Sequence, residues 1–163
     1  MTLDRPMMSE REIAVIDDLI GRHKHIKTVL EWGSGGSTVY FPKEHPEIER
    51  WVSVEHDPVF GKAIMEKVAH SVEVKVVPLE EYLSSVSGVK ADLILIDGVM
   101  RRECLMLSKA HLNPYGLVLL HDAGRSEYQD FIGRWEGPHQ KMVDGEIPET
   151  KVGFAHRGLH IFQ

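Results

Sequence analysis

The sequence is poor in cysteine, in basic residues and in long apolar runs, and each shortage excludes a class of protein. Cys104 is the only cysteine among 163 residues, so the chain forms no internal disulfide and no cysteine-ligated zinc cluster. Lys and Arg total 19 against 25 Asp and Glu, and the net charge of −6 argues against a broad nucleic-acid-binding surface. Residues 1–13 lack the apolar stretch of a secretory signal, and no apolar run is long enough to span a bilayer. We therefore expect a cytoplasmic protein without a nucleic-acid or membrane partner.

The composition that remains fits one globular domain, which we expect to cover residues 1–163. Hydrophobic residues make up 42% and charged residues 27% of the chain, a balance that can bury a substantial core. Cys104 lies in a helical pattern beside Leu105 and Leu107, so a buried thiol is a better interpretation than a nucleophile. Arg101 and Arg102 leave room for a local basic patch.

Apolar strands and amphipathic helices alternate along most of the chain. Ser9 with Glu12 has the pattern of a capping box, which predicts a first helix that ends near Gly21. Five strands are expected at residues 26–32, 51–55, 72–77, 91–97 and 116–122, the last after a turn at 113–116. Further helices are expected after the glycines near residue 35 (stopping by Pro42 or Pro46), from Pro58 to about Ala69, at 79–86, at 101–112 and around 128–135. This order predicts an α/β fold with a central parallel sheet, and strands at 140–143 and 158–162 are expected to pair antiparallel.

The most informative segment is Val29–Thr38, VLEWGSGGST, in which an apolar strand ends in an acid and three glycines follow. Gly33, Gly35 and Gly36 are expected to supply positive φ and to let a ligand lie against peptide N–H groups. Ser37 and Thr38 are suitable N-cap residues for the next helix, where their hydroxyls would favour an anionic group. The segment therefore predicts a ligand-binding loop at the carboxyl end of the first strand.

Acidic residues stand at the ends of four of the five expected parallel strands: Glu31, Glu55, Asp97 and Asp122, the last preceded by His121. Because carboxyl ends of parallel strands meet at one edge of the sheet, these side chains are expected to line one crevice. Carboxylates at successive crevice positions suit a ligand that is rich in hydroxyls or is cationic. Glu55 is placed to accept both ribose hydroxyls of an adenosine, a duty that His56 and Asp57 could share.

Two details of the sequence indicate which adenosine-containing cofactor the loop would bind. In the dinucleotide fingerprint a third glycine stands three residues after the second, but the position three after Gly35 is Thr38. Glu31, two residues before the first glycine, suits a cofactor that carries an ammonium and a sulfonium better than a pyrophosphate. A nicotinamide-dependent oxidoreductase is therefore the weaker interpretation.

Residues Glu31–Thr38, EWGSGGST, resemble motif I of class I S-adenosylmethionine-dependent methyltransferases, an acid followed by Gly-x-Gly. Glu55 matches the ribose-binding acid of that family and Asp97 its fourth motif, and the resemblance covers about residues 26–122. Four short runs also resemble the glucuronoxylan O-methyltransferase family and its bacterial relatives: LEWGSGGST at 30–38, LIDG at 95–98, LLHDAGR at 119–125 and RGLHIF at 157–162.

The resemblance implies a Rossmann-like methyltransferase fold, with a mostly parallel seven-stranded sheet, helices on both faces and an antiparallel C-terminal strand. It implies S-adenosylmethionine as cofactor and O-methylation of a small or carbohydrate-like hydroxyl acceptor. Leu79 and Glu80 stand where this superfamily contacts the adenine, although an ordinary charged first turn of a helix explains them as well. The residues expected at the cofactor are Glu31, Gly33, Ser34, Gly35, Gly36, Ser37, Thr38, Glu55, His56, Leu79, Glu80 and Asp97.

Methyl transfer is an in-line displacement, so the protein must position the reactants and supply a base for a hydroxyl acceptor. Asp97 is the first candidate beside the transferred methyl, and Asp122 with His121 is the second. Consecutive strand residues point to opposite sides, so His121 and Asp122 are expected to have separate roles. A buried, hydrogen-bonded histidine at a polar strand end is an equally good interpretation of His121.

A metal ion is not expected. Catechol-type O-methyltransferases hold magnesium through positions that match Asp97 and Asp122, but Ala123 replaces the asparagine of their third ligand. His23 and His25 are the only pair with metal-like spacing, and they are expected to be solvated in a loop.

Two further questions stay open at this point. The same fold could be a binding or scaffold protein that holds the cofactor without transferring a methyl group. The sequence also leaves open whether the protein forms a homodimer.

Overall fold

The computed structural model describes residues 3–136, 138–143 and 159–162, which build a seven-stranded sheet in the order β3-β2-β1-β4-β5-β7-β6. The strands are β1 (Thr28–Trp32), β2 (Arg50–Glu55), β3 (Val72–Val76), β4 (Ala91–Ile96), β5 (Leu112–His121), β6 (His139–Val143) and β7 (Leu159–Phe162). Strands β1 to β5 are parallel to one another, and β7 runs antiparallel to both β5 and β6. The predicted fold is confirmed. The last two strands pair antiparallel as expected, and β7 lies inside the sheet with β6 at the edge.

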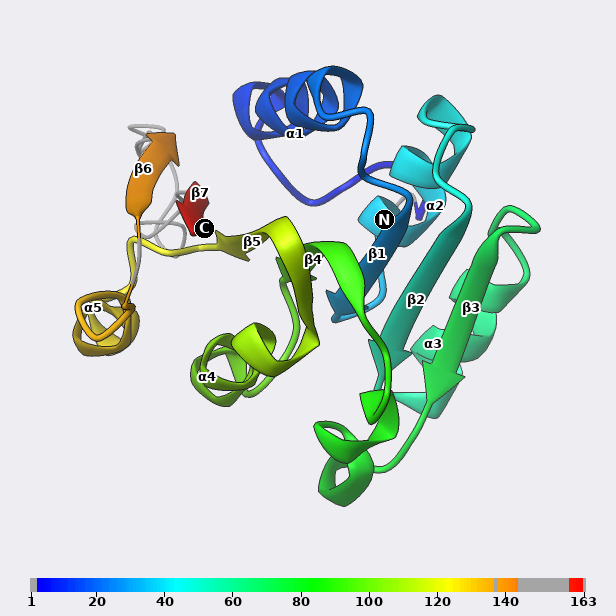
Figure 1. Ribbon diagram of the computed structural model, residues 1–163. Coiled ribbons are helices and arrows are strands. Elements are labelled where there is room, and N and C mark those ends of the chain that lie inside the picture. The colour runs from blue at the N-terminus through cyan, green and yellow to red at the C-terminus, as the bar shows by residue number, and fades with distance from the viewer. Residues whose placement is uncertain (1–2, 137, 144–158, 163) are drawn as a thin grey trace, which may run out of the picture.

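Helices cover both faces of this sheet, as Figure 1 shows. They are α1 (Glu10–Arg22), α2 (Gly36–Glu44), α3 (Pro58–Met65), α4 (Arg101–His111) and α5 (Ser126–Ile132), with 3₁₀ turns at Leu79–Glu81 and Ser84–Val86. Alternate strand residues face opposite sides, so Leu93 and Leu95 of β4 pack with α1 and α2, whereas Ile94 and Ile96 pack with α4 and α5. The sheet is therefore buried between two apolar layers, which explains the continuous apolar runs in its central strands.

The first helix begins as predicted. The Glu12 amide donates to Ser9 Oγ at 3.2 Å, and the Ser9 amide donates to Glu12 Oε2 at 2.8 Å. This reciprocal capping box satisfies amide groups that have no partner inside the helix. Cys104 is fully buried under α4, and burial raises the pKa of its thiol to about 12, as suits a core residue rather than a nucleophile.

Several predicted boundaries are wrong, because packing overrides local signals. Helix α2 passes through the buried Pro42 and ends at Glu44, so of its two expected limits the one at Pro46 is correct. Helix α3 ends at Met65, before Ala69, and Trp135 packs in the core beyond the end of α5. The expected helix at 79–86 is two separate 3₁₀ turns.

The expected turn at 113–116 lies within the bounds of β5. Ala91 pairs with Leu112 but Leu93 pairs with Leu117, so this segment bulges out of the strand. Tyr115 accommodates the bulge with a φ of 64° and is exposed. Among the described residues, no helix has the length and apolar character needed to cross a membrane.

Candidate cofactor and catalytic site

The loops that follow β1 and β4 touch each other backbone to backbone. Gly33 has a φ of 104°, and a Cβ on it would lie 2.4 Å from the backbone of Gly98. A Cβ on Gly98 would in turn lie 2.2 Å from the Tyr82 hydroxyl. Since real Cβ atoms do not approach so closely, both positions require glycine, and the two loops form one continuous rim at the carboxyl edge of the sheet.

The other two loop glycines differ from expectation. Gly35 has an extended φ of −177°, a conformation open to any residue. A Cβ on Gly36 would lie 1.8 Å from the carbonyl oxygen of Arg5, because the N-terminal segment crosses the start of α2. Figure 1 likewise shows the segment that precedes α1 passing beside α2. Of the three, only Gly33 has the expected positive φ, and the close neighbour of Gly36 is the chain itself.

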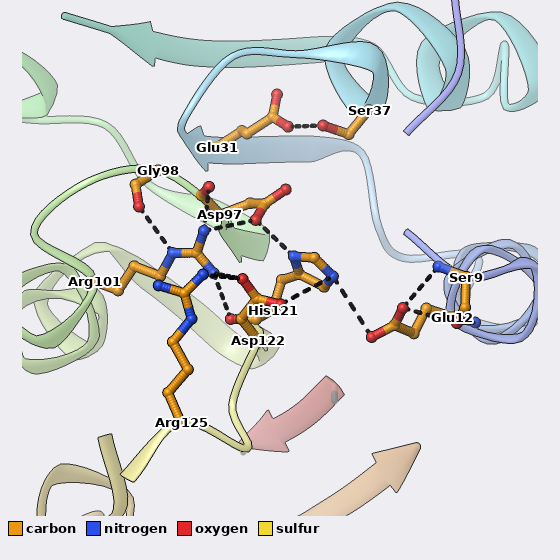
Figure 2. A network of polar contacts seen from close by, with 10 residues as sticks. All are labelled: Ser9, Glu12, Glu31, Ser37, Asp97, Gly98, Arg101, His121, Asp122 and Arg125. Atoms are coloured by element: carbon orange, nitrogen blue, oxygen red, sulfur yellow. Dashed lines mark hydrogen bonds and ion pairs between the residues drawn. The ribbon is translucent and has the colours of Figure 1, made fainter. Parts of the chain in front are cut away.

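Glu31 is enclosed rather than open to the crevice. Its side chain is 0% exposed, and its Oε2 accepts hydrogen bonds from Thr38 Oγ1 (2.6 Å), Trp51 Nε1 (2.8 Å) and Ser53 Oγ (2.9 Å). The Ser37 hydroxyl donates to Glu31 Oε1, a contact drawn in Figure 2. Burial raises the pKa of the Glu31 carboxyl to about 7, against the lowering effect of these donors.

This enclosure corrects two expectations. Glu31 stabilises the loop from beneath, and a direct contact with a ligand ammonium is closed to it in this arrangement. Ser37 and Thr38 do not cap α2 for an anion, because their hydroxyls donate to Glu31 and Gly35 takes the N-cap position. Ser34 is also buried, with its hydroxyl 2.7 Å from Ser53 Oγ. The loop side chains thus build the loop, and its backbone is the part left to a ligand.

Glu55 ends β2 beside this loop, where the sequence placed it. Its Oε1 accepts the amide N–H groups of His56 and Asp57, both at 2.8 Å, and lies 2.9 Å from His56 Nδ1. These contacts hold one carboxylate oxygen and leave Oε2 to a ligand. Asp57 has another task, because its Oδ1 caps α3 through the amides of Val59 (2.8 Å) and Phe60 (3.0 Å). Leu79 and Glu80 are exposed on the 3₁₀ turn that follows β3.

Asp97 and His121 meet at the ends of β4 and β5. His121 Nδ1 donates to Asp97 Oδ1 at 2.7 Å (Figure 2). The His121 ring is buried. Asp97 keeps 20% of its side chain exposed, which is more than Arg101, His121 or Asp122 keeps. The predicted juxtaposition of Asp97 and His121 is therefore present.

Asp122 lies on the same side as His121, contrary to the alternation expected of strand residues. The strand ends at His121, and Asp122 adopts a φ of 57°, which turns its side chain back toward the site. Its Oδ1 lies 4.0 Å from His121 Nε2, and its Oδ2 accepts from Arg125 at 2.6 Å.

Arg101 joins these strand ends and was not predicted as a site residue. Its Nε donates to the Gly98 carbonyl at 2.8 Å, and its terminal nitrogens donate to the carbonyls of Asp97 (2.9 Å) and His121 (2.7 Å). They also contact the carboxylates Asp97 Oδ1 (3.1 Å) and Asp122 Oδ2 (3.3 Å). The side chain is only 10% exposed, so no surface patch forms at this position. Arg102 instead stacks over the Phe131 ring at 4.4 Å.

Glu12 is the second site residue that the sequence did not predict. While its Oε2 serves the capping box of α1, its Oε1 lies 3.5 Å from His121 Nε2. Glu12 and His121 are both buried, so the helix presents a charge to the end of β5. Nothing in the capping-box pattern distinguishes this glutamate from one that serves the helix alone.

The neighbouring carboxylates of Asp97, Glu12 and Asp122 determine the protonation state of His121. Burial lowers the pKa of its imidazole, but attraction by Asp97, the hydrogen bond to Asp97 and the nearby carboxylates of Glu12 and Asp122 raise it to about 10. For Glu12, burial acts upward, while His121 and the Ser9 contacts bring the pKa down to about 2. His121 is thus an imidazolium at neutral pH and cannot accept a proton. Of the two interpretations of His121, the structure favours the buried, hydrogen-bonded histidine over the base.

The residues that the structure describes contain no cluster of metal-ligating side chains. No three His, Cys, Asp or Glu side chains there are grouped so as to hold a metal ion. His23 and His25 contact each other edge to face at 5.5 Å, and His25 Nε2 donates to the Tyr115 carbonyl at 3.3 Å.

Solved structures match this fold over nearly the whole chain, whereas no protein-family model and no curated protein matches the sequence. A Staphylococcus aureus protein assigned as a caffeoyl-CoA O-methyltransferase has a TM-score of 0.73 at 16% identity, over 96% of this chain and 84% of its own. This chain has the class I methyltransferase fold. A Klebsiella pneumoniae protein assigned as an O-methyltransferase has a TM-score of 0.69 at 18% identity, over 95% and 80%. The O-methyltransferase of Bacillus cereus, solved with S-adenosylhomocysteine, has a TM-score of 0.62 at 14% identity, over 96% and 82%. At these identities the likeness establishes the fold alone.

Proposed function

We propose that this chain is an S-adenosylmethionine-dependent methyltransferase acting on a hydroxyl of a small or carbohydrate-like acceptor. The observation that carries the proposal is Glu55, which two backbone amides hold at the end of β2 beside the glycine loop. This is where an adenosine ribose is bound in open α/β sheets. The class I methyltransferase fold and the bound S-adenosylhomocysteine of the Bacillus cereus neighbour support the same cofactor.

The residues divide between binding and reaction. Glu55 Oε2 would accept the ribose hydroxyls with His56 beside it, Leu79 and Glu80 would meet the adenine, and the loop backbone from Gly33 to Gly36 would receive the amino-acid tail. Asp97 would lie nearest the transferred methyl. Its Oδ1 is held by His121 and Arg101, and its Oδ2 is the oxygen left to accept a hydrogen bond from the acceptor hydroxyl.

In the reaction, the acceptor oxygen would attack the activated methyl carbon as the bond from that carbon to sulfur breaks. The sulfonium becomes a neutral thioether, and the hydroxyl proton leaves toward Asp97 or solvent. His121 and Arg101 would hold Asp97 in place, and neither would take the proton. Asp122 would be a second acceptor for it through Oδ1, because Arg101 and Arg125 hold its Oδ2.

Calorimetry tests the cofactor. We expect S-adenosylhomocysteine and S-adenosylmethionine to bind and NAD not to bind. Glu55→Ala should weaken S-adenosylhomocysteine binding by at least about tenfold, because a charge-assisted hydrogen bond contributes about 1.5–3 kcal/mol. Glu49→Ala, at an exposed position before β2, is the matched control. Binding of NAD alone would favour the oxidoreductase interpretation, and an unchanged Kd in Glu55→Ala would remove the ribose assignment.

A binding or scaffold protein is the second candidate, favoured by the ion pairs that already engage Asp97 and Asp122 with Arg101 and Arg125. A screen of hydroxylated acceptors with methyl-labelled cofactor separates the two, since transfer to any acceptor eliminates the scaffold function. The proposal covers one S-adenosylmethionine-binding domain with no nucleic-acid or membrane partner. A cytoplasmic location and the oligomeric state, including a homodimer, stay predictions.

A further inference from the structure

Arg101 stands at the centre of a shell of oxygen atoms. Three carbonyl oxygens, from Asp97, Gly98 and His121, lie 2.7–2.9 Å from its guanidinium nitrogens. Two carboxylate oxygens, Asp97 Oδ1 and Asp122 Oδ2, lie at 3.1 and 3.3 Å. A guanidinium has five N–H groups, and Arg101 uses them in four hydrogen bonds and in an ion pair with Asp97.

The same shell has the chemistry of a divalent-cation site. Mg²⁺ and Ca²⁺ prefer carboxylate and carbonyl oxygens, and Asp97 with Asp122 are the two positions that correspond to magnesium ligands of catechol-type O-methyltransferases. Mg²⁺ binds such oxygens at about 2.0–2.1 Å, so an ion held by both carboxylates would overlap the guanidinium between them. The residues present therefore do not fit a metal ion while Arg101 is in place.

We propose that Arg101 is a built-in cation that takes the position of the divalent ion between the ends of β4 and β5, so that this centre works without a metal. The claim about methyl transfer rests on the proposed function; the claim about cation occupancy does not. Because Arg101 is part of the chain, a chelator cannot remove it. It neutralises and orients Asp97 and Asp122 as a positioning residue.

The start of α4 explains how the Arg101 guanidinium is placed between the strand ends. Asp97 ends β4, the chain turns through Gly98 and through Met100 with a φ of 51°, and α4 begins at Arg101. The side chain then points back over the strand ends, as Figure 2 shows. Arg102, one position along, is exposed and stacks on Phe131, so it offers a matched control for loss of a positive charge from the same helix.

Mn²⁺ is the probe, because the electron paramagnetic resonance signal of the free ion reports binding without any enzymatic assay. We expect no stoichiometric binding to the wild-type protein or to Arg102→Ala. Arg101→Ala should bind one Mn²⁺ at least about tenfold more tightly than wild type, because the guanidinium that lies between the two carboxylates is removed. Arg101→Ala with Asp97→Asn should lose that binding. Circular dichroism confirms that each variant is folded.

Two results would overturn the inference. One is stoichiometric Mn²⁺ binding to the wild-type protein that disappears in Asp97→Asn, which needs no arginine variant to be folded. The other is a folded Arg101→Ala that binds no Mn²⁺. Titration with S-adenosylhomocysteine is run on the same samples, so a failure of the proposed cofactor is seen separately from the metal result.

Discussion

At the scale of single residues, glycine acts here mainly by letting backbone meet backbone. Gly33 and Gly98 bring two loops into contact, and Gly36 lets the N-terminal segment cross α2. Of these three, only Gly33 combines such a close contact with a positive φ. The rim of the site therefore depends on the absence of a side chain as much as on any side chain present.

Gly33→Ala should destabilise the protein by about 2–5 kcal/mol, because positive φ strain and overpacking against Gly98 add. Gly21→Ala is the control: it lies in α1 with nothing within 4 Å of the new Cβ and should gain about 0.5–1 kcal/mol. Urea unfolding of both variants measures the difference. Equal stability of the two variants would mean that the loops do not meet as described.

At the scale of elements, α1 is both a cover for the sheet and a carrier of charge. Its apolar face packs on the strands, while Glu12 uses one oxygen for the helix cap and the other for His121. The cap and the ion pair are distinct interactions of a single carboxylate. Variants can separate them.

Ser9→Ala should cost about 1 kcal/mol at neutral pH, because it removes the cap while Glu12 keeps its charge and its contact with His121. Glu12→Gln keeps a residue that serves a capping box but removes the charge that faces His121, so it should cost more, about 2–4 kcal/mol at neutral pH. Urea unfolding at several pH values distinguishes them. A smaller loss in Glu12→Gln than in Ser9→Ala would remove the ion pair as a source of stability.

Local periodicity predicted the elements but not the contacts between distant side chains. Apolar runs ending in acids located β1, β2, β4 and β5, and therefore brought Glu55, Asp97 and His121 to one edge. Glu12 and Arg101 were missed because their partners lie on other elements, and a capping glutamate or a helical arginine looks the same in sequence whichever way it points. Glu31 was placed at the right edge, but its enclosure follows from Trp51 and Ser53 of the neighbouring strand.

At the scale of the whole molecule, the Glu12–His121 pair ties stability to pH from both sides. The pKa of Glu12 falls from 4.5 to about 2 on folding, so its contribution is present above pH 4.5 and is lost as the pH falls toward 2. The pKa of His121 rises from 6.5 to about 10, so its contribution is present below pH 6.5 and is lost as the pH rises toward 10. Both contributions to stability are complete only between pH 4.5 and pH 6.5.

Between pH 6.5 and pH 10, the free energy of unfolding of the wild-type protein should therefore fall by about 2–4 kcal/mol more than that of His121→Gln. The free energy of unfolding from urea titrations across this range gives the comparison. His111→Gln, whose ring donates to the Val89 carbonyl away from these carboxylates, serves as control and should follow the wild-type curve. Parallel curves for wild type and His121→Gln would show that the imidazolium is not held by folding.

The contact between Glu12 and His121 joins two segments that leave the ribosome at different times, so it can form only late in synthesis. Helix α1 leaves the ribosome early, but its charged partner and the apolar strand β5 leave only after four other strands have been made. Until then Ile13, Ile16 and Ile20 have no full surface to cover, and they face solvent or a chaperone. Closing so distant a contact is slow. The edge of the sheet that carries Asp97 and His121 is therefore complete only when the first helix and the fifth strand are both in place.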